Sequence, residues 1–515
     1  MKIRSLAFAA AAVVTVAVGV WLTKLAPVGG TASPPMIHST FPVESAAKTI
    51  LNATHRHREW VNLPIGTAVV RAFLVYPERS DKAPVVMVSG TDQGASDWVR
   101  AAADQLAADG FLAVVPDVLS GVGPHGGDTE SFPNSEAVAS AFRRMSPDEI
   151  ARRTAVVRDY VAALPASNGQ SANLELSPRD GRIQARFEKH FASFKLNGES
   201  WRDAIGFLSK QTGNRPMTAP QSGEQAGRIQ TASFSAEDHS AHIMMAMAQQ
   251  PPSARGGPLG YPVGKLTDLP AGTFSATSTL KHSTLRKEFV DLAAGDIKVH
   301  TWVEYPVGSE KAPVVIVMQH GPGMDDWQRA LADQLALQGF IAVAADLYSG
   351  LGPNGGNWDS FEGVDAALRA SGKLTPDEAI RRYKAAYDYG IKLPRANGKV
   401  ASVGFCAGGT YSFRFAGEVP EINAAVVFYG TQPTDDIMAK IKAPVLGFYG
   451  EDDARVTSTV EPTTAAMKKL GKSYESHIYP HATHGFLEFQ DLGGNPSATA
   501  DSWARTIAFL NQHLK

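Results

Sequence analysis

Short apolar runs and longer amphipathic stretches alternate through the C-terminal half of the chain. The apolar runs have the length of buried strands and lie at residues 313–318, 341–347, 424–429 and 444–449. Between the first two, residues 326–338 carry apolar side chains near one face, which predicts a helix that Gly339 ends. Strands that alternate with helices favour an α/β fold with a mainly parallel sheet that helices cover on both faces.

The N-terminal half repeats this pattern. A shift of 229 residues aligns residues 59–169 with the C-terminal half without gaps, and nearly half of the aligned positions are identical. For example, Lys82–Val86 and Lys311–Val315 both read Lys-Ala-Pro-Val-Val. The chain therefore holds two copies of one fold rather than a solenoid. We call residues 33–212 the N-terminal copy and residues 284–515 the C-terminal copy.

The single cysteine of the chain lies in a glycine-rich frame of the C-terminal copy. Cys406 follows the apolar run 400–403 in the sequence Gly-Phe-Cys-Ala-Gly-Gly, and a helix-like run begins at Thr410. Glycines tolerate a sharp turn from strand into helix, and such a turn presents its central side chain at the carboxyl end of the sheet. The frame predicts that Cys406 is a nucleophile rather than an inert buried thiol.

An acid and a base follow the cysteine. Asp453 lies in a loop after a predicted strand, and His484 lies in a later loop that also contains His481. A thiol nucleophile needs a base and a group that orients the base. In α/β-hydrolase folds the acid and then the histidine follow the nucleophile along the chain. We therefore predict a catalytic set of Cys406, His484 and Asp453, with Asp453 preferred to Asp452.

The N-terminal copy lacks this set. Cys406 aligns with Ser177, and the next residue is Pro178, which has no N–H to offer an oxyanion. The sequence then passes to Ser200–Leu208, which resembles the last helix of the C-terminal copy, so the stretch with the acid and the base is absent. We predict a truncated, inactive copy whose open sheet edge docks on the C-terminal copy or on a second chain.

Residues 1–32 predict a signal peptide, or a membrane anchor as the alternative. Lys2 and Arg4 precede an apolar stretch from Leu6 to Leu22. Both interpretations predict an exported protein, either periplasmic or secreted, or anchored to the inner membrane.

Residues 213–283 are rich in Pro, Gly, Ser and Thr and predict a linker with one short helix near residues 235–249. His239 and His242 in that helix lack a third ligand, so we expect no metal. The 49 Lys and Arg residues nearly balance the 51 Asp and Glu residues, which argues against a nucleic-acid partner. One cysteine excludes an intramolecular disulfide.

The cysteine frame, the acid loop, the histidine loop and the run Asp346–Gly350 resemble the dienelactone hydrolases. The resemblance covers residues 284–515 and, in decayed form, residues 59–212. It implies an α/β-hydrolase fold and a Cys–His–Asp triad that opens lactones and hydrolyses esters without a cofactor. The expected mechanism is attack of sulfur on the carbonyl, a thioester intermediate, and hydrolysis by water. The N–H groups of Ala407 and Gly321 are the expected oxyanion donors.

Two positions depart from the pattern of this family. The family usually has a glutamate after the first central strand that pairs with the resting thiol, whereas this chain has His320, a second imidazole that could stabilise a thiolate. Members that act on dienelactone use an arginine to hold the substrate carboxylate, whereas this chain has Glu488, which would repel an anionic lactone. Tyr348 and Trp358 are either pocket residues or packing residues.

We therefore expect a hydrolase that acts on small esters or lactones. A thioester or amide hydrolase with the same triad is one alternative. A non-catalytic binding or scaffold protein is the other.

Overall fold

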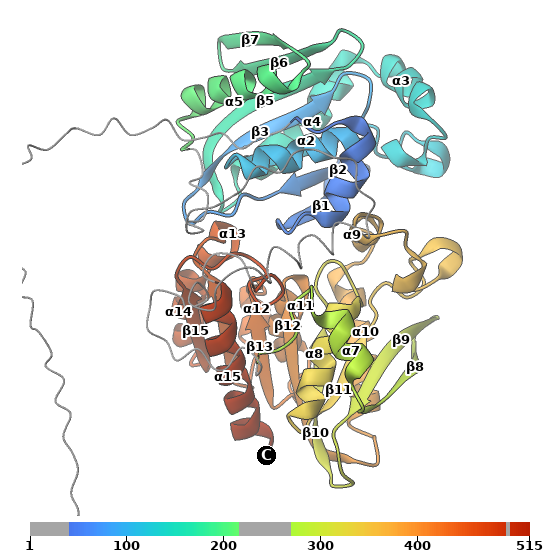
Figure 1. Ribbon diagram of the computed structural model, residues 1–515, viewed down its shortest axis with the longest axis vertical. Coiled ribbons are helices and arrows are strands. Elements are labelled where there is room, and N and C mark those ends of the chain that lie inside the picture. Colours follow the sequence, from blue (N-terminus) through green and yellow to red (C-terminus); the bar gives the residue numbers. More distant parts are fainter. Residues whose placement is uncertain (1–40, 216–268, 491–494) are drawn as a thin grey trace, which may run out of the picture. The chain divides into compact units, whose positions relative to one another are not determined.

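The computed structural model describes residues 41–215, 269–490 and 495–515 (Figure 1). The predicted export segment at residues 1–32 and the predicted helix near residues 235–249 lie outside the described residues. Among the residues that are described, none of the helices combines the length and the apolar character that a membrane span requires.

An eight-stranded sheet forms the centre of the C-terminal copy, in the order β15-β14-β13-β12-β10-β11-β9-β8. The strands from β15 to β11 pair in parallel, whereas β9 pairs antiparallel with both β11 and β8. The strands are β8 (Arg286–Ala294), β9 (Ile297–Tyr305), β10 (Ala312–Met318), β11 (Ile341–Ala345), β12 (Ala396–Phe405), β13 (Ala424–Phe428), β14 (Val445–Gly450) and β15 (Tyr474–Tyr479). The predicted mainly parallel sheet is confirmed.

Helices cover both faces of this sheet (Figure 1). Val315 and Val317 of β10 face the core that includes α8 and α15, whereas Val314 and Ile316 face the core that includes α10 and α11. Burial on both faces explains why this strand is a continuous apolar run in the sequence. The helices are α7 (Ala276–His282), α8 (Asp326–Leu337), α9 (Val364–Ser371), α10 (Pro376–Gly390), α11 (Ala407–Glu418), α12 (Asp435–Met438), α13 (Ala454–Thr457), α14 (Val460–Lys469) and α15 (Asn495–Leu514).

The N-terminal copy has a seven-stranded sheet in the order β1-β2-β4-β3-β5-β6-β7. The strand β3 pairs in parallel with β4 on one side and with β5 on the other. The other pairs in this sheet are antiparallel. The strands are β1 (Arg58–Ile65), β2 (Ala68–Val75), β3 (Ala83–Gly90), β4 (Leu112–Asp117), β5 (Ser167–Ser177), β6 (Arg182–Phe187) and β7 (His190–Lys195). The helices are α1 (Ala47–Ala53), α2 (Asp97–Ala108), α3 (Ser135–Arg144), α4 (Pro147–Ala162) and α5 (Gly198–Thr212).

The two copies differ after their last shared strand. In the C-terminal copy β12 turns into α11, and three more parallel strands follow. In the N-terminal copy β5 continues into the antiparallel strands β6 and β7, on which α5 packs. The truncated copy has therefore replaced its last three parallel strands with a hairpin, and its edge strand β7 is largely exposed.

Candidate active site

Cys406 stands at the sharp turn between β12 and α11. Its φ of 55° and ψ of −118° are rare for a residue other than glycine. A Cβ atom on Gly404 would lie 1.9 Å from the carbonyl oxygen of Gly408, and a Cβ atom on Gly408 would lie 2.1 Å from that of Met318. The two glycines are therefore required on steric grounds, because the strand, the turn and the helix pass within backbone contact of one another.

His484 and Asp453 form a buried pair beside the turn. Nδ1 of His484 lies 2.6 Å from Oδ2 of Asp453, and the two residues are 7% and 4% exposed. Burial alone would raise the pKa of Asp453, but the charge and the hydrogen bond of His484 hold it below its ordinary value. Burial alone would lower the pKa of His484, whereas Asp453 and Cys406 raise it to about 9. The imidazole is therefore protonated at neutral pH.

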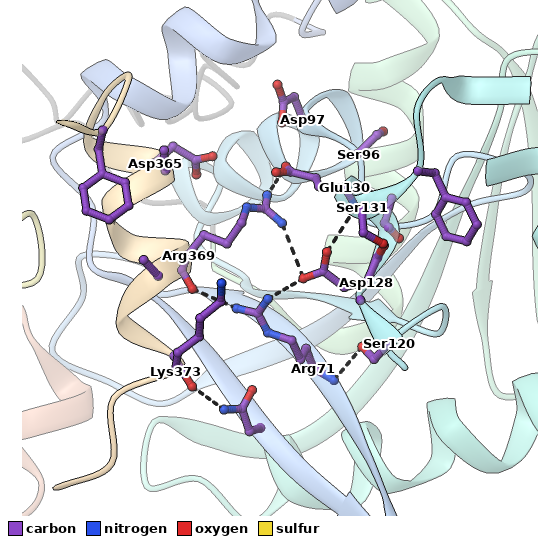
Figure 2. Close-up of a pocket in the computed structure, with 18 of the residues that line it drawn as sticks. Arg71, Ser96, Asp97, Ser120, Asp128, Glu130, Ser131, Asp365, Arg369 and Lys373 are labelled. Atoms are coloured by element: carbon purple, nitrogen blue, oxygen red, sulfur yellow. Dashed lines mark hydrogen bonds and ion pairs between the residues drawn. The ribbon is translucent and has the colours of Figure 1, made fainter. Parts of the chain in front are cut away.

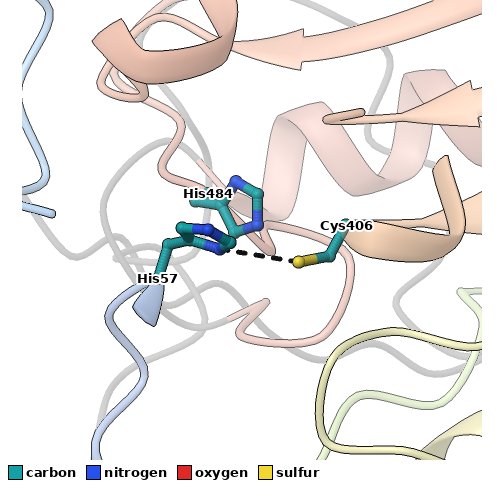
Figure 3. Close-up of side chains that lie close together, drawn as sticks. All are labelled: His57, Cys406 and His484. Atoms are coloured by element: carbon teal, nitrogen blue, oxygen red, sulfur yellow. Dashed lines mark hydrogen bonds between the residues drawn. The ribbon is translucent and has the colours of Figure 1, made fainter. Parts of the chain in front are cut away.

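Two imidazoles lie beside the sulfur of Cys406 (Figure 3). Sγ lies 3.5 Å from Nδ1 of His57, and one nitrogen each of His57 and His484 lies with Sγ in a group whose atoms are within 4.8 Å of one another. Burial alone would raise the pKa of the thiol, but His484 and His57 hold the pKa of Cys406 well below its ordinary value. The arrangement favours a thiolate next to an imidazolium.

His57 was not among the residues predicted from the sequence. It immediately precedes β1 in the N-terminal copy, far from the C-terminal copy along the chain. The internal alignment places it on Arg286, and no catalytic motif surrounds it. No signal in a single sequence marks this histidine, because its role depends on how the two copies contact each other.

A cavity of about 1290 Å³ lies in front of the sulfur. All of the predicted site residues line it except Asp453, which lies behind His484, and Trp358. Ala407 is the first residue of α11, so its N–H has no acceptor within the helix. Gly321 lies in a turn after β10 that a hydrogen bond from Gly323 N to His320 O closes at 3.1 Å.

The two aromatic residues proposed for the pocket differ. The hydroxyl of Tyr348 donates to the carbonyl of Gly321 and so supports the turn that carries a predicted oxyanion donor. The indole N–H of Trp358 donates to the carbonyl of Pro322 at 2.7 Å, and its ring packs against the two cores of the C-terminal copy. These contacts favour packing for Trp358, one of the two roles left open by the sequence.

His320 lies in an ion-pair cluster, which corrects the role expected for it. Its Nδ1 lies 3.0 Å from Glu488 Oε2 and its Nε2 lies 3.1 Å from Asp325 Oδ2. Burial alone would lower the pKa of His320, but the two carboxylates raise it well above its ordinary value. The second imidazole that contacts the sulfur is therefore His57 rather than His320. Glu488 is held by an imidazolium instead of standing alone in the cavity.

Among the described residues, three groups bring together atoms that could ligate a metal ion. His57, Cys406 and His484 offer a sulfur and two imidazole nitrogens, a donor set that suits zinc. The other two groups, one around His320 and one around Asp365, already pair their carboxylates with cationic side chains. The sulfur and the two imidazoles are therefore the group to consider when metal effects on activity are tested.

A second cavity, of about 1590 Å³, is lined by residues of both copies (Figure 2). Arg369 pairs with Glu130 and Asp128, and the guanidinium of Arg71 donates to the carbonyl of Arg369 at 3.0 Å and pairs with Asp128. None of the predicted site residues lines this cavity. Arg71 and Arg369 pair with the carboxylates that line the cavity, so we regard it as an ion-pair network rather than a candidate reaction centre.

Comparisons with known proteins bear on the family to which this chain is related. The sequence profile described as "Dienelactone hydrolase family" matches residues 70–172 and 299–514, which is more than half of the chain in two segments. A protein of Saccharolobus solfataricus named "Putative carboxymethylenebutenolidase" is 28% identical over 254 residues, which cover 42% of this chain and 95% of that protein. A Bradyrhizobium protein named "Probable 2-oxo-3-(5-oxofuran-2-ylidene)propanoate lactonase" is 29% identical and covers 45% of this chain and 96% of that protein.

A solved structure is also similar to part of this chain. A Klebsiella pneumoniae crystal structure named "Putative Dienelactone Hydrolase" is 23% identical, with a TM-score of 0.41, and covers 45% of this chain and 100% of that chain. Both matched segments of the family profile fall on the strands and helices described above, one in each copy.

Proposed function

The chain belongs to the dienelactone hydrolase family, and we propose that it hydrolyses small carboxylic esters or lactones through Cys406, His484 and Asp453. Family membership and the lactonase named among its relatives support the class of reaction. One observation carries the assignment of residues. The sulfur of a partly buried cysteine with a strained backbone lies beside an imidazole whose other nitrogen is 2.6 Å from a buried carboxylate.

Acylation begins from the thiolate of Cys406 and the imidazolium of His484. The sulfur attacks the carbonyl carbon, a C–S bond forms, and the π electron pair moves to the oxygen. The N–H groups of Ala407 and Gly321 are placed to stabilise this oxyanion. The intermediate collapses as the C–O bond to the leaving group breaks, and His484 gives its proton to the leaving alkoxide. The products of this step are an alcohol, a thioester and a neutral imidazole.

Deacylation uses the same groups in reverse. His484, now neutral, takes a proton from a water molecule as that water attacks the thioester carbonyl. The C–S bond breaks, the electron pair returns to sulfur, and the carboxylic acid leaves. Asp453 keeps Nδ1 of His484 protonated, so that Nε2 is the nitrogen that exchanges protons. The thiolate and the imidazolium are then restored.

The carboxylates around His320 favour a substrate without a carboxylate at that end of the cavity, whose lining elsewhere includes Arg56 and Arg58. Asp325, Glu488 and the imidazolium of His320 line it together, so two carboxyl groups face one imidazolium, although burial raises the pKa of Glu488. A substrate anion would be repelled there, whereas a neutral ester or lactone would not. The proposed substrates are therefore neutral, in contrast to the propanoate in the name of the Bradyrhizobium relative.

Turnover of p-nitrophenyl acetate and of a neutral five-membered lactone tests the proposal. Cys406→Ala and His484→Ala should each lower kcat by about 10³-fold or more, because one removes the nucleophile and the other the acid–base group. Wild-type turnover should also fall as the pH rises through about 9, where His484 loses the proton that the leaving group needs.

His481→Asn is the matched control for these variants. His481 lies on the same loop, is 75% exposed, and has a φ of 56° that asparagine tolerates. It should keep wild-type turnover. Undiminished turnover in both Cys406→Ala and His484→Ala would refute the triad, and a wild-type protein without turnover of either substrate would refute the assignment as a hydrolase of neutral esters and lactones.

A further inference from the structure

A histidine of the N-terminal copy touches the sulfur of the proposed nucleophile. The side chain of His57 is 10% exposed, its Nδ1 lies 3.5 Å from Sγ of Cys406, and its ring meets that of His484 edge-on at 4.5 Å (Figure 3). We propose that His57 is a catalytic residue that donates a hydrogen bond to the thiolate of Cys406, so that the N-terminal copy completes the active site of the C-terminal copy. This inference rests on the proposed function, because it takes Cys406 as the nucleophile.

A carboxylate faces the ring nitrogen of His57 that does not contact the sulfur, at ion-pair distance and without a hydrogen bond. Nε2 of His57 lies 3.7 Å from Oε2 of Glu59, and the hydroxyl of Tyr76 donates to Oε1 of Glu59 at 2.7 Å. Burial alone would raise the pKa of Glu59, but His57 and Arg455 lower it to about 2, so the carboxylate stays charged. A thiolate only accepts hydrogen bonds, so the nitrogen that faces it carries a proton.

The same support exists in the C-terminal copy without the histidine. There the hydroxyl of Tyr305 donates to Oε1 of Glu288 at 2.8 Å, in the positions that align with Tyr76 and Glu59. The residue in the place of His57 is Arg286, which is 68% exposed and lies away from the cysteine on the outer strand β8. The tyrosine–glutamate pair is thus common to both copies. The imidazole occurs only in the N-terminal copy, where the strand β1 begins beside the sulfur of Cys406.

Backbone contacts hold His57 and the acid loop in one arrangement. The N–H of Ala454, next to Asp453, donates to the carbonyl of Arg79 at 3.0 Å, and Arg79 forms a parallel bridge with Asp453. The guanidinium of Arg79 is itself fixed, because it bonds to Asp81 and to Asn214, which lies just past the N-terminal copy. The N-terminal copy therefore contacts both the nucleophile and the loop that orients its base.

His57 acts on the charge of the sulfur and does not exchange protons with the substrate. At rest its N–H stabilises the thiolate, which raises the fraction of reactive nucleophile. When the C–S bond forms, the sulfur loses its charge and the hydrogen bond weakens. When the C–S bond breaks in deacylation, the electron pair returns to sulfur and the same N–H stabilises the leaving thiolate. His57 keeps its proton throughout, while His484 performs the proton transfers.

Several titratable or charged groups face His57 from the elements packed around it. They are Glu59, Tyr76, Cys406, Asp453, Arg455 and His484. Glu59, Asp453 and the Cys406 thiolate are anionic, whereas Arg455 and the imidazolium of His484 are cationic.

The rate at which iodoacetamide alkylates the full-length protein tests this role, with EDTA present to exclude metal binding. Cys406 is the single cysteine, so the mass of the protein reports its alkylation alone. His57→Leu should slow alkylation at pH 6 by about tenfold or more, since it removes a hydrogen bond to a charged group. The midpoint of the pH profile should move to higher pH. His57→Asn should recover most of the rate, because its side-chain amide places an N–H near the position of Nδ1.

Each outcome decides the matter. His190→Gln, an exposed histidine on β7, is the control and should match the wild type. Equal profiles for wild type and His57→Leu would overturn the proposal, and so would an equal loss in His57→Leu and His57→Asn, which would indicate a packing role. If His57→Leu does not fold, His57→Gln takes its place and should also slow alkylation. The glutamine side chain is longer than that of asparagine, so its amide does not lie at the position of Nδ1. Alkylation of Cys406 does not require ester hydrolysis. The two proposals can therefore fail separately: His57 could have no effect on alkylation in a protein that hydrolyses esters, or it could slow alkylation in a protein that does not.

Discussion

The two copies share a parallel strand and then separate at the residue where the chemistry begins. In the C-terminal copy β12 ends in Gly404 and Phe405, and the chain turns at Cys406 into α11. In the N-terminal copy the residues in the positions of Gly404 and Gly408 are Glu175 and Arg179. A side chain at either position would meet backbone atoms near 2 Å in the C-terminal copy. The glycines thus decide whether the strand can turn into a helix at all.

The N-terminal copy has lost a reaction centre and gained a contact. Ser177 closes a polar turn into β6 by donating to Asp180 at 2.7 Å, so it faces no base. At the edge of the same sheet that β1 forms, His57 contacts the sulfur of Cys406. We infer that the N-terminal copy is retained because the residue before its first strand contributes to the active site of the C-terminal copy. In agreement with this, the N-terminal copy lacks the glycines of the turn at Cys406 but keeps the tyrosine–glutamate pair.

Transplanting the proline of the N-terminal copy into the C-terminal copy should have the largest effect. Ala407→Pro copies Pro178 and removes the N–H proposed to stabilise the oxyanion, so kcat for p-nitrophenyl acetate should fall by about 10²–10³-fold. Proline suits the first residue of a helix, so α11 should still form. Stopped-flow or plate assays of turnover measure the loss, and the melting temperature monitors folding.

Alkylation of Cys406 separates the oxyanion from the nucleophile in this variant. Iodoacetamide reacts by displacement at carbon and needs no oxyanion donor, so Ala407→Pro should keep the wild-type alkylation rate. Ala407→Gly retains the N–H and is the matched control, with kcat close to wild type. Wild-type turnover in Ala407→Pro would contradict the assigned donor, and a lost alkylation rate would mean that the sulfur itself had moved.

Removing Arg100 tests the contact between the copies by stability rather than by rate. Its guanidinium is fully buried, bonds to both oxygens of Asp365 at 2.6 and 2.8 Å, and also reaches Glu130 and Asp97. Arg100→Met would leave three carboxylates close together, so the free energy of unfolding in urea should fall by about 3 kcal/mol at pH 7.

The loss in Arg100→Met should shrink at pH 5, because crowded carboxylates take up protons more readily than isolated ones. Arg143→Met is the control from the same copy, since Arg143 pairs with Glu136 on the surface of α3. It should change stability by less than about 1 kcal/mol. A similar small change in Arg100→Met would show that the two copies do not depend on this ion-pair cluster.

The pattern of apolar runs was enough to predict the central strands in the sheet of the C-terminal copy, but not the outer strands β8 and β9. Its central strands are buried on both faces, so each run is continuous and ends within a residue or two of the observed strand. The glycines around Cys406 were equally informative, because a backbone that passes so closely admits no other residue. Local chain geometry of this kind depends on residues that are adjacent in the sequence, so it can be predicted without a structure.

Contacts between distant segments could not be predicted in this way. His320 and Glu488 were expected to act separately, one on the thiol and one on the substrate, and they lie 3.0 Å apart in one ion pair. His57 carries no motif, and only the approach of β1 to the turn at Cys406 makes it relevant. The hairpin β6–β7 was also missed, because the internal alignment ends before it. Each case depends on packing between elements rather than on the residues near it in sequence.

The smallest expected effect is at the serine that stands where the cysteine would be. Ser177→Ala removes one hydrogen bond to Asp180, so the free energy of unfolding should fall by about 1 kcal/mol. Ester turnover and Cys406 alkylation should both remain at wild-type values, since Ser177 faces a turn of its own copy. Cys406→Ala at the aligned position should abolish turnover, so the pair of variants compares the two copies at one site. A clear fall in turnover for Ser177→Ala, with stability changed only slightly, would contradict an inactive N-terminal copy.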